Sequence, residues 1–244
     1  MFDCENGSWR LGGRRIRDWK AYGLLPLHDV IRFSSNIGAA KIVGRVPATQ
    51  LVDGLRRFGF GERTGSGFPG ESAGILRDLS DRQLVERANL AFGQGLTVTS
   101  LQLASAAAAL ANDGRRVRPR LARSGNADTP LPTSEPAISA ASARRMRAMM
   151  RTVVESGTGS RAALPRHSVA GKTGTAQKVE HGRYSEDRFV ASFLGMLPAG
   201  APELVVVVVV DEAEQGRHTG GAAAAPIFRE FAGFAVQHLG IAPE

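Results

Sequence analysis

The hydrophobic pattern in the last third of the chain predicts three β-strands. Residues 204–211 include six consecutive valines, the composition of a strand that is covered on both faces of its sheet. A short segment with proline and glycine separates this run from the apolar run before it, which predicts an antiparallel hairpin. The predicted strands are residues 169–179, 189–197 and 204–211.

Apolar residues at helical spacing, together with capping residues, predict five helices. In the clearest of them, residues 99–112, Thr99 and Gln102 have the sequence of a capping box, and Gly114 lies just past the end. Ser34 is a good N-cap residue and predicts another helix start. The remaining predicted helices are residues 34–43, 47–58, 142–156 and 226–239.

Two of these helices have a predicted inward face. Helix 142–156 would turn a stripe of methionines toward the core, ending at Val153. Helix 226–239 begins with Pro226, which suits the first helical turn, and it is expected to lie on the sheet. Its predicted apolar face consists of Phe228, Phe231, Ala235 and Leu239.

The other segments lack a clear period. Residues 1–30 are expected to be loop with short strands or turns, and the glycine-rich residues 59–74 are expected to be a surface loop. Residues 124–136 are rich in Gly, Pro, Asp and Thr and predict a variable loop.

Composition narrows the possible functions only slightly. The formal net charge of +8 could suit nucleic acid, but the basic residues are scattered with few aromatics near them, so no nucleic-acid partner is expected. Cys4 is the single cysteine, which excludes an intrachain disulfide, and no His/Cys cluster accompanies it to bind a metal. No run of 18 apolar residues exists to span a membrane, and the first residues do not resemble a signal peptide.

A Lys-Thr-Gly triplet on the first predicted strand is the strongest chemical signal. On a strand, Lys172 and Gly174 point to one face, whereas Thr173 and Thr175 point to the other. Gly174 has no side chain, so a ligand can approach that face of the strand closely. Lys172 supplies positive charge and a threonine hydroxyl can bind a carboxylate, so this strand is a candidate site for an anionic substrate.

A second triplet, Ser34-Ser35-Asn36, lies far upstream and has the S-x-N form. In serine enzymes that recognise penicillin, an S-x-N triplet precedes K-T-G in the chain. The predicted helix start at Ser34 would place the triplet at the mouth of a helix. Further segments that resemble these enzymes lie at residues 2–7, 58–61, 69–71, 92–99 and 220–228.

With these motifs in this order, the chain resembles the C-terminal part of the transpeptidase domain of a class B penicillin-binding protein of the cell-division or sporulation type. The resemblance implies an α/β (α+β) fold of the penicillin-binding transpeptidase and β-lactamase type, with an antiparallel sheet flanked by helices and a helical subdomain. Residues 1–244 would then form one domain. Its helical part with the S-x-N motif is expected at about residues 30–115, and a helix, three strands and a final helix at about residues 140–244.

The resemblance also implies a reaction. A serine would attack the D-Ala-D-Ala bond of a peptidoglycan stem peptide, form an acyl-enzyme and pass the acyl group to a neighbouring amine, and β-lactams would trap the serine. Ser34 would relay a proton and Asn36 would position the substrate amide, while Lys172 would supply charge. Thr173, Gly174 and Thr175 would bind the substrate carboxylate, and the N–H of Thr175 would form half of the oxyanion hole. No metal or organic cofactor is implied.

Membership of such a family further implies a domain on the outer side of the cell membrane. It also implies partners among other cell-division or cell-wall synthesis proteins. The membrane anchor of such proteins precedes the segment that this chain resembles.

The chain departs from the family pattern in one respect. The nucleophile belongs to an S-x-x-K motif, but the residues three places before the four lysines are Arg17, Gly38, Val169 and Thr175. We therefore expect an N-terminal truncation and an isolated chain without activity. The valine run agrees, because a three-strand meander would leave this apolar strand at the sheet edge, so a further strand is expected beside it.

Two alternative functions fit the same motifs. A D,D-carboxypeptidase or β-lactamase would share the superfamily, but the class A lactamase glutamate is followed four residues later by Asn, and Glu86 is followed there by Leu90. The other alternative is a non-catalytic scaffold or β-lactam sensor. The intact residues of both triplets argue against decay, since a scaffold has no chemical need for all of them.

Overall fold

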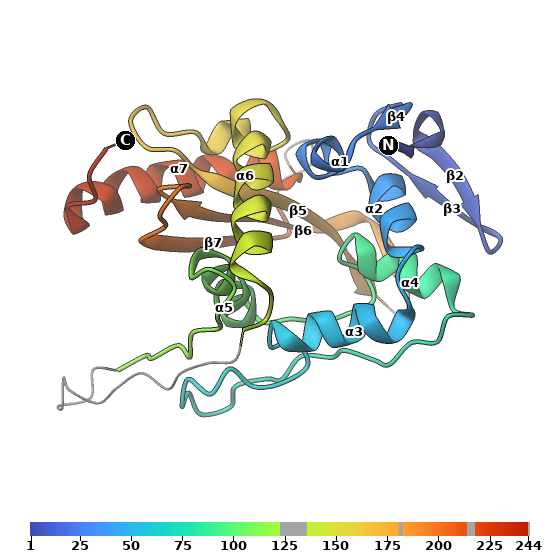
Figure 1. Ribbon diagram of the computed structural model, residues 1–244, viewed down its shortest axis with the longest axis horizontal. Coiled ribbons are helices and arrows are strands. Elements are labelled where there is room, and N and C mark those ends of the chain that lie inside the picture. Colours follow the sequence, from blue (N-terminus) through green and yellow to red (C-terminus); the bar gives the residue numbers. More distant parts are fainter. Residues whose placement is uncertain (123–135, 181–182, 214–217, 244) are drawn as a thin grey trace.

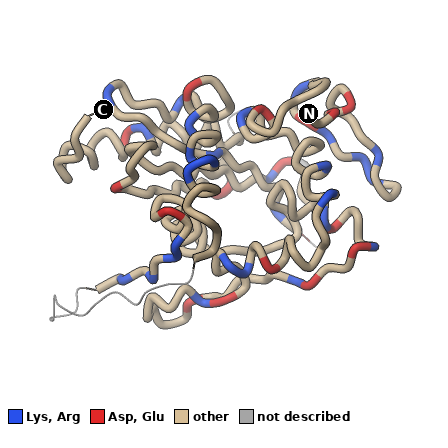
Figure 2. Tube along the Cα trace, viewed as in Figure 1, with Lys and Arg blue, Asp and Glu red and all other residues tan. Residues whose placement is uncertain are grey.

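A computed structural model of the chain describes residues 1–122, 136–180, 183–213 and 218–243. The predicted variable loop at residues 124–136 lies outside the described residues except for Pro136. Basic and acidic residues lie on many of the described elements, separated by long uncharged stretches at residues 88–112 and 189–202 (Figure 2).

A three-stranded antiparallel sheet forms the core of the second half of the chain (Figure 1). Its strands are β5 (Ala170–Glu180), β6 (Arg183–Leu197) and β7 (Leu204–Asp211), in the order β5-β6-β7. Thr173 pairs with Phe193, which in turn pairs with Val208. The predicted strands and the hairpin are confirmed, although β6 begins at Arg183 rather than at residue 189.

Helices cover both faces of this sheet (Figure 1). Helix α7 (Gly220–Leu239) packs on one face, where Phe193 and Phe228 are fully buried with ring centroids 4.8 Å apart. Helices α5 (Ser100–Ala111) and α6 (Ala140–Ser156) contribute Ala107 and Met150 to a second apolar cluster with Met196. The K-T-G strand is thus held between two hydrophobic layers.

Strand β7 is covered on both faces but has an open edge. Val206, Val208 and Val210 pack toward the α7 layer, and Val205 packs toward the α5 and α6 layer. Within the described residues no strand pairs with its outer edge, and Val209 is 42% exposed. The additional strand expected beside β7 stays a prediction.

The first part of the chain forms a separate apolar cluster beside the sheet (Figure 1). Cys4, Val30 and Ile37 are buried at its centre. The elements of this first part of the chain are β1 (Phe2–Asp3), η1 (Glu5–Gly7), β2 (Ser8–Leu11), β3 (Arg14–Arg17), β4 (Leu24–Leu25), α1 (Leu27–Phe33), α2 (Asn36–Val43), α3 (Ala48–Arg57) and α4 (Leu84–Ala91).

The local predictions are confirmed where capping residues define an element. Helix α5 has the predicted capping box, because Thr99 and Gln102 exchange side-chain and backbone hydrogen bonds. Helix α3 follows Pro47 as expected, and residues 59–74 form no helix or strand. Helices α1 and α4 were not predicted, since neither has a capping side chain at its start.

Helix α7 corrects two predictions. It begins at Gly220 rather than at Pro226, which therefore lies inside the helix. Of the predicted inward face, Phe228 and Ala235 are buried, but Phe231 and Leu239 are 53% and 57% exposed. The helix approaches the sheet through small residues, so the buried stripe runs along Ala224, Ala225, Phe228, Ala232, Ala235 and Val236.

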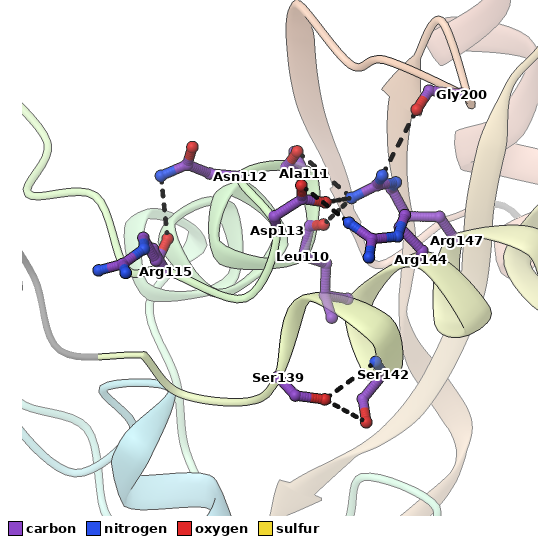
Figure 3. Close-up of polar contacts among 10 residues, drawn as sticks. All are labelled: Leu110, Ala111, Asn112, Asp113, Arg115, Ser139, Ser142, Arg144, Arg147 and Gly200. Carbon is purple, nitrogen blue, oxygen red and sulfur yellow. Dashed lines mark hydrogen bonds and ion pairs between the residues drawn. The ribbon is translucent and has the colours of Figure 1, made fainter.

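A buried arginine of α6 joins three elements and was not predicted. Arg147 is 6% exposed, and its guanidinium donates to the carbonyl of Leu110 at 2.7 Å and to the carboxylate of Asp113 at 3.1 Å, at the end of α5 (Figure 3). It also donates to the carbonyl of Gly200, between β6 and β7, at 3.4 Å. Arg147 thus caps α5 and ties it to the sheet.

Candidate active site

Ser34 lies in the turn between α1 and α2 and does not begin a helix, contrary to the prediction. It ends α1 in a left-handed conformation, with φ 57° and ψ 46°. The N-cap of α2 is Ser35, whose Oγ accepts a hydrogen bond from the Gly38 amide at 2.9 Å. The Ser35 side chain therefore caps the start of α2, and the Ser34 side chain faces the sheet.

Lys172 of β5 contacts the Ser34 side chain. Its Nζ donates to the Oγ of Ser34 at 2.6 Å and to the carbonyl of Thr173 at 2.9 Å. No carboxylate within the described residues forms an ion pair with it. Burial without a counter-charge lowers the pKa of Lys172 from its usual 10.5 to about 8.

The two threonines of the motif face the opposite side of β5 from Lys172, as predicted. The Oγ1 of Thr173 lies 2.8 Å from the Oγ1 of Thr158, in the turn after α6. The Oγ1 of Thr175 accepts a hydrogen bond from the Gly220 amide at 3.1 Å. Because Thr175 is exposed and accepts from the backbone, its own hydroxyl proton is available to a ligand.

Gly220 lets the start of α7 approach the K-T-G strand, and Gly174 leaves room on that strand for the Ser192 side chain of β6. A Cβ on Gly220 would lie 2.3 Å from the Ser192 carbonyl oxygen and 2.5 Å from that of Gly174. A Cβ on Gly174 would lie 2.4 Å from the Ser192 hydroxyl, so a neighbouring side chain occupies the space that the sequence assigned to a ligand. Ser192 and Gly220 belong to the site region, and no local sequence signal marks Ser192.

Asn36 lies at the first position of α2, two residues after Ser34. Its side-chain nitrogen donates to the Arg17 carbonyl at 2.9 Å, which fixes the amide and leaves its oxygen as a free acceptor for other donors. The structure therefore brings Ser34 and Lys172 into direct contact, and it holds Asn36 in the same turn as Ser34.

The described residues offer little for metal or thiol chemistry. No group of three or more His, Cys, Asp or Glu side chains among them is arranged to hold a metal ion. Cys4 is fully buried, and burial raises the pKa of its thiol, so the thiol stays protonated.

The chain matches the family model described as penicillin binding protein transpeptidase domain over residues 1–233. It is 36% identical over 236 residues to the probable peptidoglycan D,D-transpeptidase PenA of Neisseria gonorrhoeae, covering 96% of this chain and 40% of that protein. It is 35% identical over 250 residues to stage V sporulation protein D of Bacillus subtilis, covering 98% of this chain and 38% of that protein.

Solved structures show the same fold. The transpeptidase domain of penicillin-binding protein 3 from Burkholderia pseudomallei is 35% identical, with a TM-score of 0.91 over 100% of this chain and 73% of that chain. Penicillin-binding protein 3 from Mycobacterium tuberculosis, solved with aztreonam, is 36% identical, with a TM-score of 0.85 over 98% of this chain and 57% of that chain.

The chain spans about 40% of the length of the curated relatives described above. Among its described helices, none combines the length and the apolar character that a bilayer crossing requires.

Proposed function

We propose, from the premise that the chain belongs to the penicillin-binding protein transpeptidase domain family, that it carries the S-x-N and K-T-G parts of a peptidoglycan D,D-transpeptidase site. The observation that carries the proposal is the 2.6 Å hydrogen bond from Lys172 to Ser34. We place the nucleophilic serine outside these 244 residues, since no lysine here has a serine three positions before it.

Acylation begins when that serine attacks the carbonyl carbon of the penultimate D-Ala of a stem peptide. The serine's own proton passes to the lysine of its S-x-x-K motif as the new C–O bond forms. The C–N bond breaks, the leaving D-Ala nitrogen takes a proton from Ser34, and the acyl group stays on the serine as an ester. The Ser34 oxygen accepts a hydrogen bond from Lys172, so its own proton can point to the leaving nitrogen. The lowered pKa of Lys172, about 8, lies near neutral pH and allows the lysine to restore that proton.

Transfer completes the cycle. An amine of a neighbouring stem peptide attacks the ester carbonyl and passes a proton through Ser34 to Lys172, and the departing serine oxygen regains its proton from the lysine of its S-x-x-K motif. The tetrahedral oxyanion is held by the N–H of Thr175 on β5 and by the N–H of the nucleophilic serine. In support, β5 pairs only with β6 among the described strands, so its outer edge has free backbone donors.

Substrate binding uses both faces of β5. Thr175, exposed and hydrogen-bonded through its oxygen by Gly220, donates its proton to the terminal carboxylate, and Lys172 adds positive charge. Thr173 supports that contact from its hydrogen bond with Thr158. Asn36 accepts from the substrate amide through its side-chain oxygen.

The binding partners that we propose follow from the transpeptidase activity. They are stem peptides that end in D-Ala-D-Ala, β-lactams that resemble them, and other proteins of cell division or cell-wall synthesis. The β-lactam proposal is supported by the Mycobacterium tuberculosis relative, whose structure holds aztreonam. Such substrates place the domain on the outer side of the cell membrane.

The test uses the protein encoded by the complete gene. We would incubate it with a stem pentapeptide and an acceptor stem with a free amine, and separately with benzylpenicillin, and analyse the products by mass spectrometry. A cross-linked dimer supports the transpeptidase. Hydrolysed tetrapeptide alone indicates a carboxypeptidase, catalytic turnover of penicillin indicates a β-lactamase, and no product of any kind indicates a sensor or scaffold.

A further inference from the structure

The backbone of Ser34 adopts a conformation that a serine rarely adopts on its own. Its φ of 57° and ψ of 46° lie in the left-handed region, where the Cβ of an L-residue is crowded by the following carbonyl oxygen. Such a conformation persists only where the surrounding structure fixes it, and it is characteristic of functional turns. Ser34 lies within such a turn, so its neighbours must supply the restraint.

Part of the restraint comes from α1 itself, because the Ser34 amide donates to the Ile31 carbonyl at 3.2 Å and the Ser35 amide to the Val30 carbonyl at 3.0 Å. The rest comes from residues 17–19, the segment at the end of β3. Their side chains and carbonyls bond to residues on both sides of Ser34. The four hydrogen bonds are Trp19 Nε1 to the Phe33 carbonyl at 3.0 Å, Ser35 Oγ to Asp18 Oδ2 at 2.6 Å, the Asn36 side-chain amide to the Arg17 carbonyl at 2.9 Å, and the Ile37 amide to Asp18 Oδ1 at 3.1 Å.

Asp18 is the centre of this set because each of its oxygens accepts one bond. The Ser35 hydroxyl already accepts from the Gly38 amide, so its proton is directed to Asp18. The carboxylate also accepts from an amide in the first turn of α2, where negative charge is favourable. A neutral side chain of the same size, such as that of Asn, cannot accept one hydrogen bond on each of two oxygens.

We propose that Asp18 is a positioning residue that fixes the Ser34 hydroxyl against Lys172, by holding Ser35 and Ile37, just after Ser34, through its two carboxylate oxygens. Asp18 does not touch the substrate in this role. It acts through the turn, so its loss frees Ser34 to move away from the lysine and exposes the ammonium group to water. The inference rests on the proposed function only in treating Ser34 and Lys172 as a working pair.

The primary experiment measures the pKa of Lys172 by competitive labelling with acetic anhydride over a pH series, read by peptide mass spectrometry. The chain has only four lysines, and Lys178, whose ammonium contacts Asp211 and Glu212 rather than the turn at Ser34, serves as the internal reference. In the parent chain we expect Lys172 to titrate at about 8. In Asp18→Ala we expect its pKa to rise toward the ordinary lysine value, with a smaller rise in Asp18→Asn, which keeps one acceptor.

The matched control is Asp81→Asn. Asp81 also accepts a backbone amide at the start of a helix, from Ala48 at 2.8 Å, but at α3, away from the Lys172 contact. This variant is expected to leave the Lys172 titration unchanged. A general loss of stability would move none of these values in the folded protein, so the titration separates positioning from mere support of the fold.

The outcome decides the inference whichever variant folds. If Asp18→Ala does not fold, Asp18→Asn is measured instead, together with Trp19→Phe, which removes the donor to the Phe33 carbonyl and keeps an aromatic ring beside Tyr22. An unchanged Lys172 pKa in folded variants would overturn the proposal. The measurement needs no turnover, so it stands even if the complete protein proves not to be a transpeptidase. If it is one, Asp18→Ala should also lower its penicillin acylation rate at least tenfold.

Discussion

The ammonium nitrogen of Lys172 lies 2.6 Å from the hydroxyl oxygen of Ser34, although 138 residues separate them in the sequence. This contact joins the sheet to the first part of the chain and puts both triplets in one place. It also removes much of the lysine from water without giving it a carboxylate partner. Burial of the charged ammonium group therefore lowers the free energy of unfolding, although the proposed chemistry requires this group.

That cost makes Lys172→Met a stabilising change at neutral pH. The pKa of Lys172 is about 8 in the folded protein and near 10.5 in the unfolded chain. Below about pH 8 both states hold the proton, and the folded state bears the full cost. We expect Lys172→Met to raise the free energy of unfolding at pH 7 by about 1–3 kcal/mol, toward the lower value because the side chain is partly exposed.

The sign of the pH dependence provides a second check. Between pH 8 and 10.5 the unfolded chain still binds a proton that the folded protein has released, so the stability of the parent rises with pH. The advantage of Lys172→Met should shrink across this window. Urea unfolding at pH 7 and pH 10 measures it, with Lys178→Met as the control. Equal stabilities of Lys172→Met and parent at pH 7 would show that Lys172 bears no such cost.

Lys172→Ala should lower β-lactam acylation of the protein encoded by the complete gene at least tenfold. Hydrogen bonds to a charged group contribute roughly 1.5–3 kcal/mol, and about 1.4 kcal/mol corresponds to a factor of ten. Lys178 is the matched control, because it lies on the same strand and contacts Glu212 and Asp211 instead of Ser34. Labelling with a fluorescent penicillin gives the rates. Similar rates for both variants would remove Lys172 from the site.

Gly220→Ala and Gly233→Ala should have opposite effects although both lie in α7. The Gly220 methyl would meet backbone atoms of β5 and β6, which costs about 1–3 kcal/mol or more. At Gly233 the nearest atom is a Leu164 methyl at 3.8 Å, so alanine should stabilise the helix by up to about 1 kcal/mol. Thermal unfolding of the two variants compares them. A Gly220→Ala protein as stable as the parent would mean that α7 can shift away from the strand.

The 244-residue chain should form no stable covalent adduct with benzylpenicillin. Covalent catalysis needs a nucleophile beside a base, and no serine of this chain has a lysine three residues later. Intact-mass spectrometry after incubation tests this directly. A stoichiometric mass increase that maps to Ser34 would instead identify the serine bonded to Lys172 as a nucleophile in its own right.

The isolated chain should self-associate through the open edge of β7. An exposed apolar strand edge is a template for pairing with another chain, and Val209 is the most exposed valine of the run. We expect Val209→Glu to shift sedimentation profiles toward monomer. Phe231→Glu, on the exposed face of α7, is the comparison. If only the Phe231 variant dissociates, helix α7 and not the strand edge mediates association.

Sequence patterns predicted best the elements whose determinants are local. The capping box of Thr99 and Gln102 needs only residues three positions apart, and the valine run needs no partner to predict a strand. Ser34 shows the limit, because Ser34 and Ser35 are equally good caps by type. Their different roles depend on Asp18 and Trp19, which only the folded chain brings near.

The start of α7 could not be predicted for a similar reason. By propensity Gly220 and Gly221 argue against a helix, and the sequence therefore favours a start at Pro226. In the structure the glycines are required because any Cβ at Gly220 would strike the strand. The faces of the sheet were predictable from alternation, but the contact between Lys172 and Ser34 depended on the family order of motifs and not on spacing.

The guanidinium of Arg147 has a consequence for how the molecule unfolds. Its partners belong to the end of α5 and to the turn between β6 and β7, so neither region can melt alone without leaving a buried cation partly unpaired. Breaking such a contact costs several kcal/mol, which opposes partly unfolded intermediates. The Arg147 side chain thus couples the unfolding of the helical layer to that of the sheet. Residues 140–244 expressed alone would lack the α5 groups to which this arginine donates.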